Sequence, residues 1–283
     1  MRVPHKTKRS SAHNAISGDD HNVQHEGPDM IETLAINDAQ ATLAQVRQAM
    51  TPHSRHISVA QPGGALKELQ VTRMGVGPLD TSMGLFNLYD FQVDDHWGQY
   101  YALVKADLDS SLMPVLPPSG LIPLRIDSGC CTGQLFHDRS CDCEEQFRYG
   151  MRQMEEVGTG ILISVPKQDG RGKGLAFKLS TLRLQADLGW DTVTAAQWLS
   201  HGAEIDERDY SGAIACLRFL GATPATRFLL LTGNPKKERA LRQNGFTLVT
   251  RPPKVRVTSH TRRHLQAKMT VLGHHVPGLV MPI

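Results

Sequence analysis

The pattern of apolar and polar positions divides the 283-residue chain into an N-terminal extension and a larger folded part. Residues 1–29 are rich in His, Ser, Asn, Asp and Lys, with few large apolar side chains, so we expect a mobile tail. Residues 37–50 carry apolar side chains at helical spacing and Pro52 follows, which predicts a helix that ends there. We interpret 53–64 as a connector. The sequence therefore predicts an extension over 1–65, partly disordered and with one helix.

From residue 66 onward, short apolar runs alternate with longer amphipathic patterns. The predicted strands are 85–91, 99–104, 124–126, 160–165 and 228–231. The predicted helices are 144–156, one carrying Leu175, Leu179, Leu182 and Ala186, and one that opens at 234–237. Strands that alternate with helices indicate an α/β architecture, so we expect one main domain over 66–283.

Composition excludes several classes of protein. Hydrophobic residues make up 40% of the chain, charged residues 21%, and the formal net charge is +3. These values give no strong bias toward nucleic acid or an anionic membrane. Five cysteines in a chain of this length do not resemble a secreted disulfide framework. The basic start is followed by no apolar segment, and no run is long enough to span a bilayer. We therefore expect a cytoplasmic protein.

Three cysteines form the most informative motif. Cys130, Cys141 and Cys143 have the spacing C-x10-C-x-C. Three thiolates suit Zn²⁺, and a set of three leaves a fourth position where the metal would activate a water. Two other interpretations stay open at this point. The cysteines could be small buried hydrophobic residues, or Cys131 could complete a closed structural site.

Three loops between the predicted elements carry charged or anion-binding residues. The Gly-rich loop 167–174 follows a strand and precedes a helix, which suits phosphate, although a solvated basic turn fits equally well. The loop 204–211 contains five charged residues, although Asp209 or Ser211 could simply cap the helix that follows. The segment 231–237 ends a strand and opens a helix. We expect Asp206 and Arg208 of the loop 204–211 to be needed for turnover and dispensable for folding.

Together these segments resemble GTP cyclohydrolase II, from about Leu79 to His275. The resemblance rests on the cysteine spacing, Cys-Asp-Cys with Gln146 after it, Gln-x-Gly-Arg-Gly-x-Gly-Leu, Asp191-Thr192-Val193, Asp206-Glu207-Arg208-Asp209-Tyr210 and Leu-Leu-Thr-x-Asn-Pro-Lys-Lys. It implies a mixed sheet with flanking helices. It also implies a hydrolase of riboflavin biosynthesis that opens the imidazole ring of GTP and releases formate and pyrophosphate.

The resemblance assigns roles to individual residues. The zinc ligands are Cys130, Cys141 and Cys143. The proton acceptor is Asp206. Arg208 falls on the residue proposed to attack the α-phosphate, although a guanidinium stays protonated and could instead stabilise phosphate charge. The implied nucleotide contacts are Arg125, Gln146, Asp169, Gly170, Arg171, Thr192, Thr232 and Lys237. Mg²⁺ would accompany the triphosphate, and the family is typically dimeric.

Six positions depart from the family pattern in ways that bear on the chemistry. A leucine, Leu182, stands where the family has a tyrosine that helps ring opening. His-Ser-Glu before the first cysteine is 127–129, Asp-Ser-Gly, and an acidic residue is replaced by Gln134. Gly233 and Ala267 replace an asparagine and a threonine. These changes leave two alternatives open: a paralogue that hydrolyses another nucleotide ring, such as a pyrimidine nucleotide in catabolism, and a nucleotide-binding regulator without catalysis. We expect a nucleotide partner and neither nucleic acid nor membrane.

Overall fold

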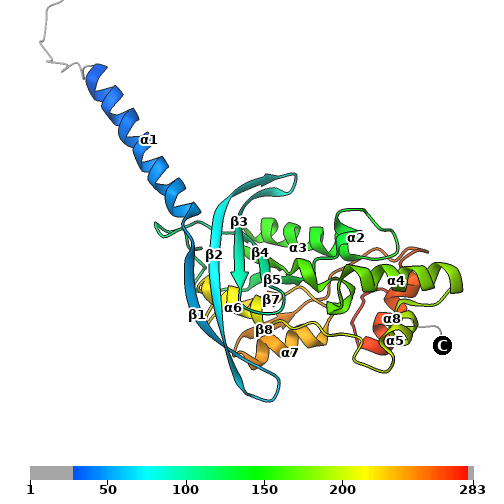
Figure 1. Ribbon diagram of the computed structural model, residues 1–283. Coiled ribbons are helices and arrows are strands. Elements are labelled where there is room, and N and C mark those ends of the chain that lie inside the picture. The colour runs from blue at the N-terminus through cyan, green and yellow to red at the C-terminus, as the bar shows by residue number, and fades with distance from the viewer. Residues whose placement is uncertain (1–27, 280–283) are drawn as a thin grey trace, which may run out of the picture. The chain divides into compact units, whose positions relative to one another are not determined.

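A computed structural model describes residues 28–279 of the chain (Figure 1). The chain divides into two compact units, Met1–Ala44 and Gln45–Ile283. Helix α1 spans Pro28–Met50, so the helix predicted over 37–50 is confirmed and begins earlier than expected. The predicted mobile tail otherwise lies outside the described residues. No helix within residues 28–279 is both long and apolar enough to cross a membrane, and the cytoplasmic location stays a prediction.

The unit Gln45–Ile283 is built on a mixed sheet of eight strands in the described residues. The strands are β1 (His53–Ala60), β2 (Leu66–Thr81), β3 (Gly84–Val93), β4 (Gln99–Lys105), β5 (Ile122–Asp127), β6 (Gly160–Ser164), β7 (Arg227–Leu230) and β8 (Thr247–Thr250). Their order is β1-β2-β3-β4-β6-β5-β7-β8. The pairs from β1 to β6 are antiparallel, whereas β6, β5, β7 and β8 are parallel. The predicted α/β class with a mixed sheet is confirmed.

The segment expected to be a connector is the edge strand β1, so that expectation is wrong. β1 pairs antiparallel with β2 from His53 opposite Arg73 to Ala60 opposite Leu66. Along β1, Val59 is fully buried and most other side chains are exposed. An edge strand with one wet face contains few apolar residues, so its pattern resembles a loop. The sheet therefore begins before residue 66.

Helices cover both faces of the sheet. The helices that follow α1 in the described residues are α2 (Cys131–Gln134), α3 (Cys143–Val157), α4 (Gly174–Leu188), α5 (Thr192–Ser200), α6 (Ser211–Phe219), α7 (Pro235–Gln243) and α8 (Arg262–Leu272), with a short 3₁₀ segment η1 at Pro166–Gly172. Successive side chains of a strand point to opposite faces. Accordingly Ile161 and Ile163 pack in the main core with α6, whereas Leu162 packs with Met151 and Met154 of α3. The strongly apolar central strands predicted this two-sided burial.

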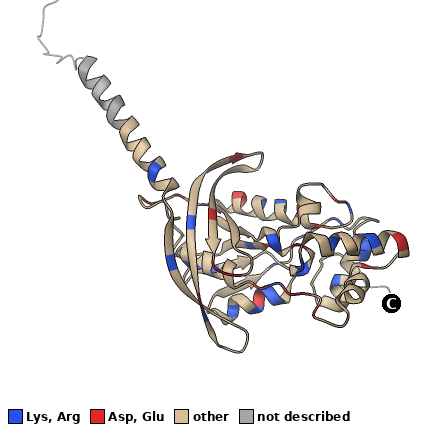
Figure 2. Cartoon of the chain, viewed as in Figure 1, with Lys and Arg blue, Asp and Glu red and all other residues tan. Residues whose placement is uncertain are grey.

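The parallel part of the sheet determines where the loops of interest meet. Strands β5, β6 and β7 run side by side, so their carboxyl ends lie at one edge. The cysteine loop follows β5, η1 follows β6, and Thr232 follows β7. Helices α4 and α7, which come after two of these loops, both carry Lys and Arg (Figure 2). The fold therefore brings thiols, a Gly-rich turn and basic helices together.

Candidate active site

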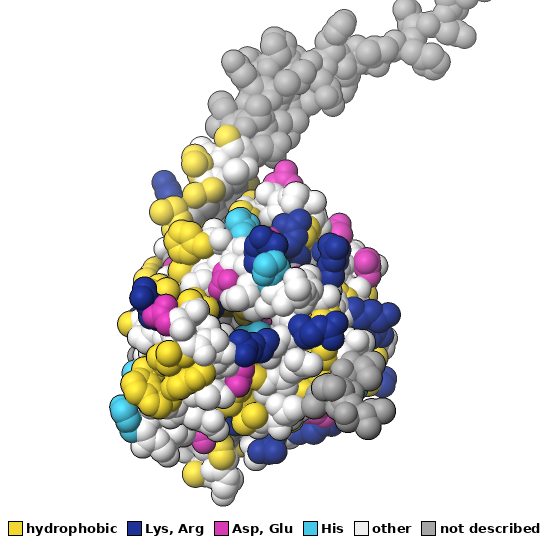
Figure 3. All heavy atoms as spheres, turned by 90° about the vertical axis from the view of Figure 1, so that its right-hand side faces the viewer, with side chains coloured by type: hydrophobic (Ala, Val, Ile, Leu, Met, Phe, Trp, Pro, Cys, Tyr) yellow, Lys and Arg dark blue, Asp and Glu magenta, His cyan; other side chains and the backbone are white. Residues whose placement is uncertain are grey.

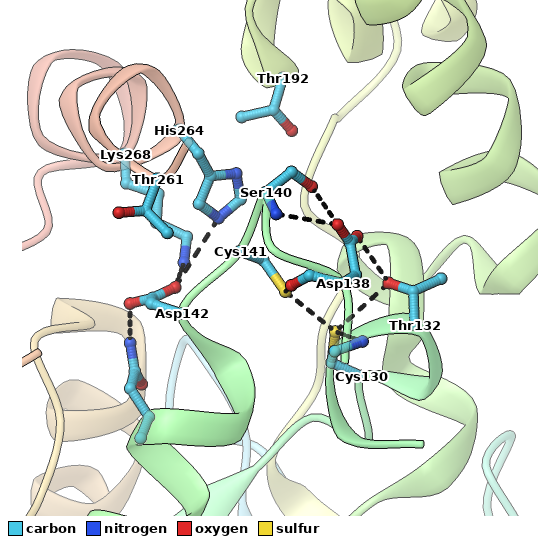
Figure 4. Close-up of polar contacts among 12 residues, drawn as sticks. Cys130, Thr132, Asp138, Ser140, Cys141, Asp142, Thr192, Thr261, His264 and Lys268 are labelled. Atoms are coloured by element: carbon cyan, nitrogen blue, oxygen red, sulfur yellow. Dashed lines mark hydrogen bonds and ion pairs between the residues drawn. The ribbon is translucent and has the colours of Figure 1, made fainter. Parts of the chain in front are cut away.

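The three cysteines of the motif converge at this edge. The Sγ atoms of Cys130, Cys141 and Cys143 lie within 4.8 Å of one another, and Cys130 and Cys141 are 3.8 Å apart (Figure 4). Gly133 permits this approach, because a Cβ there would lie 2.7 Å from the Cys141 Sγ. Cys131 is not in the cluster and borders a separate apolar groove. The donor set is therefore three thiols, which fits a metal with soft-ligand preference such as Zn²⁺.

A lysine that the sequence reasoning missed contacts this cluster. Lys178 Nζ on α4 lies 2.7 Å from the Cys130 Sγ and 3.2 Å from the Asp169 carboxylate. Hydrogen bonds from Cys141 and Cys143, together with the Lys178 charge, lower the pKa of Cys130. The signal in the sequence was a lysine in the first turns of the helix after the Gly-rich loop. The contact gives the thiol cluster a cation that can stabilise its negative charge.

Asp169, a predicted nucleotide contact, is largely occupied by protein groups. Its oxygens accept hydrogen bonds from the backbone N–H of Cys131 (2.9 Å) and of Gly170 (2.8 Å), and Lys178 approaches the same carboxylate. Asp169 is buried, and burial is the main reason why its pKa is raised. The residue therefore ties the Gly-rich turn to the cysteine loop.

A first cavity opens on the α4 side of the cluster. Its lining includes the three clustered cysteines and also Asp169, Gly170, Arg171, Lys178, Leu182, Thr192 and Arg208. Gly170 and Arg171 both have φ of 62°, a backbone region that favours glycine and is uncommon for arginine. This turn directs the Arg171 guanidinium to Thr192, where it donates to the backbone oxygen and to Oγ1 at 3.3 Å. Burial and the neighbouring Arg208 lower the pKa of Arg171 to about 10, so it stays positive.

A second cavity lies on the other side and shares Cys130, Cys143 and Arg208 with the first. Its lining also includes Arg125, Gln146, Thr232 and Lys237. The buried Lys237 Nζ donates to the Ile126 oxygen at 2.7 Å. Burial, with the charges of Arg125 and Arg208, lowers the pKa of Lys237 to about 7. The two cavities thus gather every predicted site residue except Asp206.

Asp206 lines neither cavity and contacts Arg208, which lines both. Its carboxylate accepts two hydrogen bonds from the guanidinium, Nε to Oδ1 at 2.7 Å and Nη2 to Oδ2 at 2.6 Å. The side chains are 3% and 12% exposed. Burial favours the neutral acid, but the bonds and charge of Arg208 outweigh it and lower the pKa of Asp206 to about 2. The expectation that these charges are dispensable for folding conflicts with this burial, because removal of one partner leaves the other charge buried without a counter-ion.

The C-terminal segment adds residues that the sequence reasoning gave no role. Lys268 on α8 donates to Asp142 Oδ1 at 2.8 Å, and His264 lies 3.8 Å from the same oxygen (Figure 4). Gln146 donates to the other oxygen of Asp142. Lys268 and His274 line both cavities. The acidic residue between two cysteines therefore joins the cysteine loop to a helix more than a hundred residues later.

The departures from the family pattern at 127, 129 and 134 belong to one hydrogen-bonded unit around Asp127. Asp127 accepts from Arg125 (2.9 Å), from the Gly129 backbone N–H (2.9 Å) and from Gln134 Nε2 (2.8 Å). A side chain at Gly129 would place its Cβ 2.7 Å from the Val165 oxygen, and φ there is 59°. The carboxylate that the family pattern leads one to expect at 129 has no space, and the negative charge lies at 127 instead.

Two further departures have visible consequences. At Gly233 a Cβ would collide with the His275 oxygen, and the His275 N–H donates to the Gly233 oxygen at 2.9 Å. Glycine there lets the C-terminal segment pack against the site. Leu182 lines the first cavity. Tyr210 does not replace the missing hydroxyl, because it is buried against Asn234 and lines neither cavity.

The comparisons with known proteins identify the family. The family model of GTP cyclohydrolase II matches residues 72–253. The chain belongs to the GTP cyclohydrolase II family. It is 32% identical over 199 residues to a GTP cyclohydrolase-2 of Haemophilus influenzae, which covers 70% of this chain and 86% of the relative. It is 38% identical over 166 residues to a GTP cyclohydrolase-2 of Xylella fastidiosa, covering 58% and 40%.

A third relative, the riboflavin biosynthesis protein RibBA of Bacillus velezensis, is 35% identical over 197 residues, covering 69% of this chain and 46% of the relative. The chain therefore spans less than half the length of two of these relatives and most of the third. The predicted family is confirmed. The individual site residues stay predictions, supported by their convergence on the two cavities.

Proposed function

We propose that this chain is a metal-dependent hydrolase that opens the imidazole ring of GTP and releases formate and pyrophosphate, as a step of riboflavin synthesis. The observation that carries the proposal is the junction of the two cavities. The thiol cluster lies where they meet, with Arg208 bordering both. A nucleotide that spans the junction would place its base on one side, its phosphates on the other and the ring carbon near the metal.

We propose Zn²⁺ at Cys130, Cys141 and Cys143, where it would supply a Lewis acid that activates water. The protein's own groups bind and orient the substrate. Arg171 and Arg208 offer positive charge to the triphosphate in the first cavity, which Mg²⁺ would accompany. Basic side chains also gather on the face of the molecule shown in Figure 3. Arg183 of α4 and Arg262 and Arg263 of α8 are exposed.

The Asp206–Arg208 geometry bears on how these two residues act. A guanidinium held by both carboxylate oxygens is a fixed, fully charged donor. We propose that Arg208 stabilises phosphate charge and does not act as a nucleophile, because it stays protonated. Asp206 lies outside both cavities and would act by holding Arg208 in place. This differs from the proton-acceptor role that the resemblance implied for Asp206.

One observation favours a second candidate. Leu182 presents a hydrocarbon surface to the first cavity, where the family pattern has a tyrosine hydroxyl. Proton transfer by a positioned group typically contributes about 10²–10⁴-fold to a rate. A chain without that group would turn over GTP slowly, or would use its metal on another nucleotide ring, such as a pyrimidine nucleotide. A regulator that binds nucleotide without turnover is the remaining alternative.

We also propose a homodimer. An apolar groove lined by Leu79, Met83, Phe147 and Leu175 runs beside α3 and the start of α4. Leu175 and Leu179 of α4 are 39% and 52% exposed. Exposed apolar patches of this kind mark interaction surfaces. Light scattering coupled to gel filtration should give twice the chain mass, whereas a monomer at micromolar concentration would contradict the proposal.

The decisive test of function uses purified, zinc-loaded protein incubated separately with GTP, UTP, UMP and ATP, and mass spectrometry of the products. The proposal predicts a ring-opened guanine nucleotide with formate and pyrophosphate from GTP. Consumption of a pyrimidine nucleotide with GTP untouched would establish the second candidate. Tight binding of GTP without any product would establish the regulator.

A further inference from the structure

The carboxylate of Asp142 does not cap the helix that follows it, although it stands at the capping position. Asp142 is the residue before α3, where an aspartate normally accepts hydrogen bonds from the first N–H groups of the helix. Here its side chain makes no such cap. One oxygen accepts from Lys268 Nζ and the other from Gln146 Nε2. The side chain of Asp142 is 1% exposed, so both oxygens are committed to these partners.

This arrangement fixes the orientation of the Gln146 amide. A carboxylate is an acceptor, so the atom of Gln146 that faces it is the NH₂ group and not the carbonyl oxygen. The carbonyl Oε1 accepts no hydrogen bond from any described residue. Gln146 lines the second cavity. The polar atom that Gln146 offers to a ligand there is therefore an acceptor.

The surroundings of Gln146 suit a planar base. Pro253, Val255 and Val276 line the same cavity and supply apolar surface. Guanine presents two adjacent donors on one edge, N1–H and the C2 amino group, and a carbonyl oxygen matches them. Xanthine carries an oxygen in place of the amino group, so Gln146 Oε1 would face another acceptor. A buried acceptor without a donor is costly, which makes this contact discriminating.

We propose that Asp142 is a positioning residue that turns the Gln146 amide with Oε1 toward the second cavity, so that the site selects guanine over xanthine. This inference rests on the proposed function, because it assumes that a purine base occupies the second cavity. It adds a determinant of base choice that lies between two of the metal-site cysteines and is anchored by α8 through Lys268.

Asp142→Asn makes a directional prediction. Lys268 is a donor, so the new amide must turn its oxygen to Lys268 and its NH₂ group to Gln146. Gln146 must then rotate its carbonyl toward Asn and its NH₂ group toward the cavity. The cavity now offers a donor, which matches the C2 oxygen of xanthine and opposes the amino group of guanine.

The test is calorimetric binding of GTP and of xanthosine triphosphate to the full chain, with zinc content measured for each variant. The wild type should bind GTP more tightly by roughly ten- to a hundredfold. Asp142→Asn should lower this ratio at least tenfold or reverse it. Glu144→Gln removes a carboxylate one residue beyond Cys143 that pairs with His137, so it should keep the wild-type ratio.

The outcomes separate the two proposals. If the wild type binds GTP without preference over xanthosine triphosphate, or if Asp142→Asn keeps the wild-type ratio, this inference is wrong and the proposed function stands. If the wild type binds no purine nucleotide, both fall. Should Asp142→Asn lose zinc or fail to fold, Gln146→Leu provides the second test. It leaves Asp142 in place and should bring the two affinities within a few-fold, whereas an unchanged ratio would overturn the inference.

Discussion

Asp206→Asn removes one charge from a buried ion pair at the site and leaves its partner in place. The Arg208 guanidinium is 12% exposed and donates to both oxygens of Asp206. Asparagine offers one acceptor where the carboxylate offered two, and it carries no charge. Arg208 would then be a buried cation without a counter-ion. We expect a loss of folding stability together with a loss of turnover.

The magnitude follows from the pKa of Asp206. Its reduction from 3.8 to about 2 corresponds to roughly 2 kcal/mol of stability at neutral pH. Breaking a buried pair by removing one partner typically costs about 3–5 kcal/mol. We therefore expect the free energy of unfolding to fall by roughly 2–4 kcal/mol. For a domain of this size that is a decrease in Tm of about 5–15 °C.

The pH dependence has a definite sign. The folded pKa lies below the unfolded one, so the stabilisation is present above about pH 4 and is lost as pH falls from 3.8 toward 2. Urea titrations of wild type and Asp206→Asn should differ by a constant amount between pH 5 and 8. The difference should shrink below pH 4.

The double variant Asp206→Asn with Arg208→Gln is the matched control for the effect of leaving Arg208 without a counter-ion. Removal of both partners leaves no uncompensated cation, so the double variant should be more stable than Asp206→Asn alone. Both variants should turn over nucleotide at least tenfold more slowly, since a displaced phosphate ligand is costly. Equal stability of Asp206→Asn and wild type between pH 5 and 8 would refute the reasoning.

Three further predictions concern the metal and the first cavity. Cys141→Ser should lose zinc by elemental analysis and Cys131→Ser should keep it; full zinc content in Cys141→Ser would defeat the ligand assignment. Leu182→Tyr should raise formate release from GTP, and a wild-type rate of about 1 s⁻¹ or more would show that no hydroxyl is missing. Lys178→Met should weaken zinc binding in chelator competition, because the cation beside the thiolates is lost, while Lys178→Arg should retain the wild-type affinity. Equal zinc affinities of the wild type and both variants would show that Lys178 does not stabilise the thiolates.

Much of the parallel half of the sheet was predictable because each element there has a strong local signal. The apolar run 160–165 and the helix that Gly158 ends with φ of 77° follow from pattern and turn chemistry alone. β1 was missed because an edge strand needs few apolar residues. The helix that carries Leu175 and Leu179 was predicted from its periodicity, which reveals an apolar face and not what covers it.

In the candidate site, too, the residues with a local sequence signal were predicted and those without one were missed. The three cysteines and the Gly-rich turn were found because close spacing in the sequence carries their chemistry. The pairing of Asp142 with Lys268 joins residues 126 positions apart, and no local pattern predicts it. The same holds for Lys178, whose thiol partner comes from another loop. Asp206 was found but given the wrong surroundings, because a run of charges does not reveal that its members are buried.

The most direct test of the central claim is incubation of the zinc-loaded protein with GTP labelled at C8, with the label followed over time. The account predicts that GTP is consumed slowly and that the label leaves the purine ring, appearing in formate or in the formyl group of a ring-opened nucleotide. Intact labelled GTP after prolonged incubation, with a pyrimidine nucleotide consumed under the same conditions, would contradict it.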